Sequence, residues 1–85
     1  MKDFLFNFPS NTEFSDKYIT MGLKIAYYRR KAGFTQEYLA ELIGKSVSFV
    51  GHVEGTGTVR GVSLETLFKI AQVLNIPPEK LLEED

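Results

Sequence analysis

The clearest pattern in this chain is a pair of short apolar stripes between residues 35 and 54, each at helical spacing. The positions that form the stripes are Leu39, Ala40 and Ile43 in the first segment and Val50 and Val53 in the second. Gly44 lies between them, where a chain leaving a helix commonly needs a positive φ. Ser46 follows as a candidate N-cap, and Thr35 precedes the first segment in the same way. The pattern predicts two short helices joined by a tight turn.

A longer helix is predicted before this pair, starting at about Asp16 or Thr20 and ending at Ala32, with Gly33 after it. The residues expected on its inward face are Met21, Ile25, Tyr28 and Ala32. Leu23 and Tyr27 lie off this stripe, so we expect them to be exposed and to offer a surface to the N-terminal residues or to a partner.

Two more helices are predicted after Glu54 and a glycine-rich loop at residues 55–61. Ser63 caps the first, and Asn75 closes it in a left-handed conformation. The residues expected on its buried face are Leu64, Leu67, Phe68, Ala71 and Leu74. Pro77 and Pro78 start a last short helix, from which Leu81 and Leu82 are expected to point inward. The fold class is therefore all-α, with five helices.

Residues 1–19 form a different kind of segment, an N-terminal arm. Phe4, Phe6 and Phe8 alternate, which suits a short extended strand, and residues 9–12 read as a turn. Two interpretations stay open. The arm is either a leader, loose or folded on its own domain, or it docks on a second subunit, because so many aromatic side chains are costly to expose.

Composition narrows the function classes. The chain has no cysteine and one histidine, so neither a disulfide framework nor a zinc cluster is expected, and no cofactor or metal is predicted. No apolar run approaches membrane-spanning length, and we expect a cytoplasmic protein with no membrane partner. The net charge of −1 is unevenly distributed: residues 20–75 carry seven basic and four acidic side chains, whereas residues 76–85 are acidic. The body therefore permits DNA binding without strongly favouring it.

Residues 20–82 resemble the XRE-type helix-turn-helix family of phage Cro and repressor proteins. The motifs that carry the resemblance are Thr35-Gln36-Glu37, Leu39-Ala40-Glu41, Gly44 with Ser46, Glu54, and the run from Ser63 to Ala71. The resemblance implies a lambda-repressor-like domain over residues 20–85, with the helix-turn-helix at about 35–54. Residues 1–19 lie outside it.

The resemblance also implies roles for individual residues. Arg29 and Glu54 occupy the positions of a partly buried ion pair that ties the first helix to the third. Gln36 is at the position that clamps the phosphate backbone, and its amide beside a helix N-terminus suits that chemistry. The third helix would read base edges through Val47, Ser48 and His52.

This third helix departs from the family pattern. Its exposed face has no Arg, Lys, Gln or Asn, and Gly51 takes a position that usually carries a side chain. It is therefore either a recognition surface or a scaffold that contacts protein. Phe49 fits either a packing role or an exposed partner contact. The further phosphate-contact candidates are Lys45, Arg60 and the hydroxyls of Ser48 and Thr58.

The leading hypothesis is a sequence-specific double-stranded DNA-binding transcriptional regulator that acts as a homodimer on a palindromic site. The alternative is a protein-interaction or antitoxin-like module on the same fold, which binds a partner through the third helix or the aromatic arm. The sequence has no paired carboxylates, no nucleophile with a partnered histidine and no phosphate-binding glycine loop, so we do not expect an enzyme.

Overall fold

Four α-helices and one short 3-10 helix make up the fold in the part of the chain that the computed structural model describes, residues 13–57 and 61–84. They are α1 (Ser15–Lys31), α2 (Gln36–Ile43), α3 (Val47–Glu54), α4 (Leu64–Leu74) and the 3-10 helix η2 (Pro78–Leu81). These described residues contain no strand, and the prediction of an all-α domain is confirmed. The predicted strand at Phe4, Phe6 and Phe8 lies outside the described residues.

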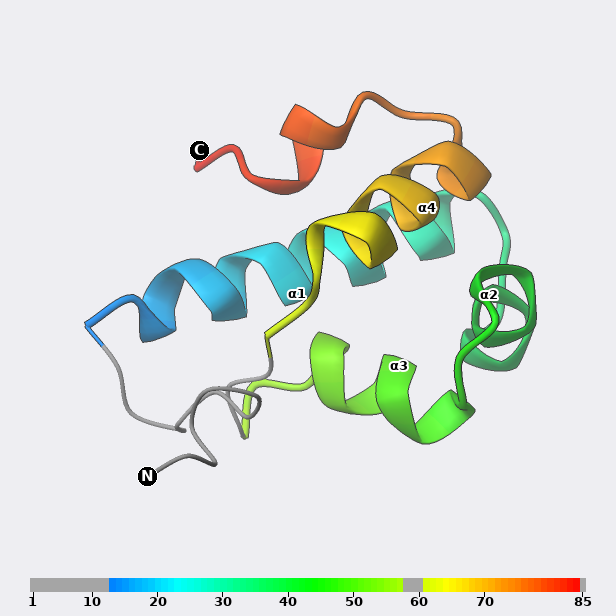
Figure 1. Ribbon diagram of the computed structural model, residues 1–85, viewed down its shortest axis with the longest axis horizontal. Coiled ribbons are helices and arrows are strands. Elements are labelled where there is room, and N and C mark those ends of the chain that lie inside the picture. The colour runs from blue at the N-terminus through cyan, green and yellow to red at the C-terminus, as the bar shows by residue number, and fades with distance from the viewer. Residues whose placement is uncertain (1–12, 58–60, 85) are drawn as a thin grey trace.

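The longest helix, α1, runs across the middle of the molecule (Figure 1). In this view α3 lies below α1 and η2 lies above it, and α1 contacts both. α2 packs against α3 and α4, while α4 packs against α1 and η2 as well. Because α1 starts at Ser15, residues 15–19 of the segment assigned to the arm belong to this helix.

Short local signals set the ends of the helices, as the sequence predicted. Side-chain hydroxyls cap three N-termini: Thr35 accepts from the amide of Tyr38, Ser46 from that of Phe49, and Ser63 from that of Thr66. Each hydroxyl satisfies an amide that has no partner within its helix. Left-handed residues end two of the helices, with φ of 72° at Gly44 after α2 and 60° at Asn75 after α4.

One hydrophobic core joins all five helices. Its members are Met21, Ile25, Leu39, Ala40, Ile43, Val50, Val53, Leu67, Ile70, Ala71, Leu74 and Leu81. The five core positions predicted between residues 35 and 54 are all in it. Leu81 is fully buried, so η2 closes the core between α1 and α4.

The predicted buried face of α4 was partly wrong. Leu64 and Phe68 are 66% and 52% exposed, whereas Ile70 is 1% exposed. The buried residues of α4 are Thr66, Leu67, Ile70, Ala71 and Leu74, and α4 packs against α1, α2 and η2. Leu82 is also exposed, since consecutive side chains of a tight helical turn point in different directions and Leu81 takes the inward one.

The inward face of α1 also differs from the prediction. Ala32 is exposed, and the buried residues are Met21, Gly22, Ile25, Ala26 and Arg29. A Cβ on Gly22 would overlap the carbonyl oxygen of Val53, so the glycine allows α1 and α3 to approach closely. Met21 and Ile25 are buried as predicted, but the apolar pattern did not place Arg29 on this face, because its side chain is charged.

Candidate nucleic-acid interface

The segment from Thr35 to Glu54 forms the predicted helix-turn-helix. α2 and α3 pack against each other through their apolar faces, and Gly44 makes the turn between them. Ser46 then starts α3 by capping it, with 3.0 Å between its oxygen and the amide nitrogen of Phe49. The cap and the turn together fix where α3 begins.

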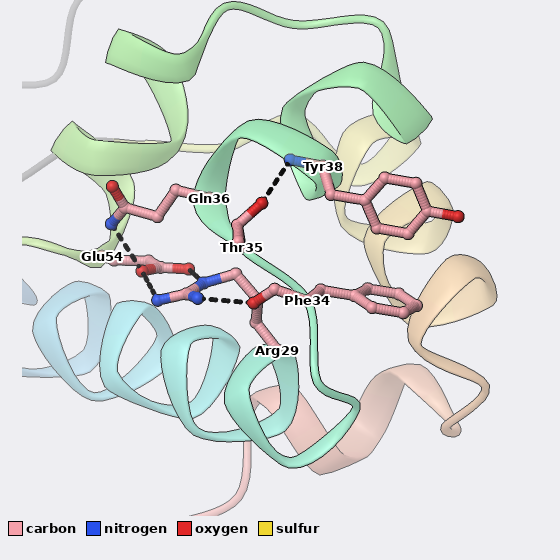
Figure 2. A network of polar contacts seen from close by, with 6 residues as sticks. All are labelled: Arg29, Phe34, Thr35, Gln36, Tyr38 and Glu54. Carbon is pink, nitrogen blue, oxygen red and sulfur yellow. Dashed lines mark hydrogen bonds and ion pairs between the residues drawn. The ribbon is translucent and has the colours of Figure 1, made fainter.

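The far end of α3 is held by a buried ion pair. The carboxylate of Glu54 accepts from Nε of Arg29 at 2.7 Å and from Nη2 at 2.9 Å, and both side chains are less than a tenth exposed. The remaining nitrogen, Nη1, donates to the carbonyl oxygen of Phe34 at 2.8 Å. Figure 2 shows the guanidinium between the carboxylate and this carbonyl. The pair that the resemblance implied is thus present, and it links α1, the turn before α2 and the last residue of α3.

Gln36 joins the same carboxylate from α2. Its Nε2 donates to Oε1 of Glu54 at 2.9 Å, and the side chain is half-buried (Figure 2). Sequence reasoning missed this contact, because nothing local relates two residues eighteen positions apart. One N–H of the amide is used within the protein, and the amide has a second N–H to offer.

The outer surface of α3 is nearly free of charge. Val47, Ser48 and His52 are exposed, as predicted for the base-contact candidates, with Val47 at 43%. They share one end of the domain with the exposed Lys45, whose Nζ lies 5.5 Å from the centre of the Phe49 ring. Phe49 itself is partly buried against the core. Arg60 and Thr58 lie outside the described residues.

A second exposed surface lies on α1. Leu23 and Tyr27 are 50% and 54% exposed, in line with the prediction. They line a surface depression of about 730 Å³ between α1 and the C-terminal residues, together with Lys24 and Lys80. Glu83 also lines it and pairs with Lys80, so this surface mixes apolar groups with charges of both signs.

A helix-turn-helix with a fixed, outward-facing third helix defines the class of this protein, and comparison with known proteins gives the family. A family model described as helix-turn-helix matches residues 25–81. The restriction-modification controller protein C.AhdI from Aeromonas hydrophila has 36% sequence identity to this chain and a TM-score of 0.71, over 78% of this chain and 97% of that one. The chain belongs to the helix-turn-helix family of Cro- and repressor-like proteins.

This chain is also similar to SinR of Bacillus subtilis, the master regulator for biofilm formation, as seen in two solved complexes of SinR. Its complex with DNA gives 28% identity and a TM-score of 0.68, over 74% of this chain and 98% of that one. Its complex with the SinI protein gives 30% identity and a TM-score of 0.68, over 75% of this chain and 61% of that one. No curated protein sequence matches the chain. No helix in residues 13–57 or 61–84 is long and apolar enough to cross a membrane.

Proposed function

We propose that this protein is a sequence-specific double-stranded DNA-binding transcriptional regulator, which acts as a homodimer on a palindromic site through α3. The observation that carries the proposal is the position of α3. Its first residue is fixed by the Ser46 cap and its last by the Arg29–Glu54 pair, and the face between them is exposed. A recognition helix needs such rigid support, because base contacts depend on its orientation in the major groove.

The proposed base contacts follow from the side-chain chemistry of α3. Val47 offers an apolar surface to a thymine methyl group, and Ser48 donates to or accepts from a base edge. His52 donates to a purine acceptor. None of these side chains makes the bidentate contacts of Arg or Gln, so discrimination between sites rests on shape and apolar contact more than on paired hydrogen bonds.

The proposed phosphate contacts surround α3. Lys45 lies in the turn before it, and Gln36 carries its second N–H at the N-terminus of α2, where the helix dipole favours an anion. Thr58 and Arg60, which follow α3 in the sequence, complete the set. We expect about four phosphates per subunit at most, and hence a shallow dependence of affinity on salt.

Selection of bound sequences from a random duplex pool at two salt concentrations tests this function. The expected result is an enriched site with two related halves, spaced so that the two α3 helices lie roughly 34 Å apart along the duplex. If no sequence is enriched at low salt, the proposal fails.

Lys45→Gln then tests the phosphate contact. It should reduce the slope of log affinity against log salt by about 0.9 for each subunit, equally on selected and unrelated duplexes. The matched control is Lys17→Gln, which removes the same charge from a residue paired with Glu84 on an exposed surface. A slope that falls equally in both variants would contradict a specific contact by Lys45.

The second candidate function is a protein-interaction module. The exposed Leu23 and Tyr27 beside a depression on α1 favour it, and the SinR–SinI complex shows that a similar protein binds a protein partner. Under this alternative, α1-surface variants would abolish activity in cells without changing the affinity of the purified protein for the selected duplex.

A further inference from the structure

In the described part of the chain, neither packing nor backbone conformation requires a glycine at position 51. The other glycines of the helical region differ in this respect. Gly22 is needed because a Cβ would overlap α3, and Gly44 because its φ is positive. Gly51 has neither requirement. Its φ is not positive, and a Cβ would meet only Oε1 of Gln36, at an ordinary contact distance of 3.9 Å.

A glycine at this position has a cost. It lies inside α3, which has eight residues, and glycine is among the least favourable residues in a helix interior. The structure has room for alanine at this position. A partner that needs the space where the Cβ would lie would offset this cost.

The position of Gly51 indicates what that partner is. By helical spacing it lies one turn after Val47 and Ser48, on the face that also presents His52. Gly51 is partly exposed, and Oε1 of Gln36 lies 3.9 Å from the place that its Cβ would take. At Gly51 the backbone therefore has no side chain over it, in the middle of the surface that we propose contacts DNA.

We infer that Gly51 is a specificity-determining position, at which the C5-methyl group of a thymine packs directly against the Cα of α3. The inference rests on the proposed function and extends it to the base that is recognised. A Cα offers no strong donor or acceptor, so a polar base edge facing it would lose its water without gaining a hydrogen bond. The thymine methyl is the apolar group of the major groove, and the neighbouring Val47 extends the same apolar surface.

The test combines Gly51→Ala with removal of single methyl groups from the DNA. Gly51→Ala should keep or raise the midpoint of thermal unfolding, because alanine fits and favours the helix. Its affinity for the selected site should fall about tenfold or more, since the added methyl meets a close-packed surface. Its affinity for unrelated duplex DNA should change less than about twofold, because that binding rests on phosphate contacts.

Replacing each thymine of the selected site with uracil then locates the contact. At one position in each half-site, uracil should lower the affinity of the wild-type protein for the duplex and restore the affinity of Gly51→Ala. Gly57→Ala is the control for the substitution itself, because a Cβ at that position has nothing within 4 Å.

The outcomes separate the two proposals. If wild-type protein selects no sequence, the proposed function and this inference both fail. If it selects a site that Gly51→Ala binds equally well, only the inference fails. The inference also fails if Gly51→Ala lowers the unfolding midpoint or reduces the affinity for all duplexes equally. It fails as well if uracil restores the affinity of Gly51→Ala at no position of the site.

Discussion

Replacing Arg29 with methionine tests how much the buried ion pair stabilises the domain. Methionine retains an unbranched apolar chain and removes the guanidinium. The Glu54 carboxylate, whose side chain is 4% exposed, would then lose two donors and keep the one from Gln36. The carbonyl oxygen of Phe34 would lose its arginine donor as well.

The size of the effect follows from this geometry. Removing one partner of a buried ion pair costs about 3–5 kcal/mol, because the other charge stays buried without compensation. A domain of this length has a total stability of about 4–13 kcal/mol, at 0.05–0.15 kcal/mol per residue. The variant should therefore lose at least about a quarter of its stability. A loss of about 3 kcal/mol lowers the midpoint of thermal unfolding by about 12–24 °C in a domain of this size.

Urea unfolding followed by far-UV circular dichroism measures this loss, with the double variant Arg29→Met and Glu54→Leu beside it. The double variant should be more stable than Arg29→Met alone, because no charge is left buried. Lys17→Met is the matched control. It breaks an ion pair of similar length, 2.9 Å, between side chains that are 64% and 55% exposed, and it should cost less than about 1 kcal/mol.

Two results would refute this reasoning. One is an Arg29→Met variant within about 1 kcal/mol of the wild type at an unchanged m-value, which would mean that the buried carboxylate is compensated by other groups. The other is a double variant as unstable as the sum of its two single variants, which would mean that the two side chains do not act as a pair.

Two further predictions concern the ends and the outer surface of the helices. Ser46→Ala should cost about 1 kcal/mol in urea unfolding, because the amide of Phe49 loses its acceptor. Ser48→Ala, at the exposed second residue of α3, should cost less than about 0.5 kcal/mol. Equal costs would contradict the capping role. Leu23→Glu should abolish dimerisation in sedimentation velocity if the homodimer forms through the α1 surface, while Leu64→Glu, at a position that is 66% exposed on α4, should leave it intact. The reverse result would place the dimer contact on α4.

Features set by neighbouring residues could be predicted from the sequence. The caps at Thr35, Ser46 and Ser63 and the left-handed ends at Gly44 and Asn75 are all present. Each depends on a few consecutive residues, whose side chains bond the backbone within the same turn. The order of the helices followed from these signals.

Features that depend on packing between helices could not be predicted equally well. Leu64 and Phe68 were expected inside and are exposed, because the side of α4 that meets the core is set by α1, α2 and η2. On α1, the charged Arg29 lies on the buried face and so does not register in an apolar pattern.

The candidate site divides in the same way. The exposure of Val47, Ser48 and His52 followed from the helical spacing, but the hydrogen bond from Gln36 to Glu54 joins two helices and has no local signal. The roles of these residues toward DNA stay predictions, as do those of Thr58 and Arg60.

The way in which α3 is held has a consequence for changing what the domain binds. Its supports are the Ser46 cap at one end, the Glu54 carboxylate at the other, and the apolar side chains of Val50 and Val53 between them. None of these groups belongs to the outward face. The outward residues can therefore be exchanged as a set while the framework stays the same, so the exposed surface of α3 can be redesigned without loss of the fold.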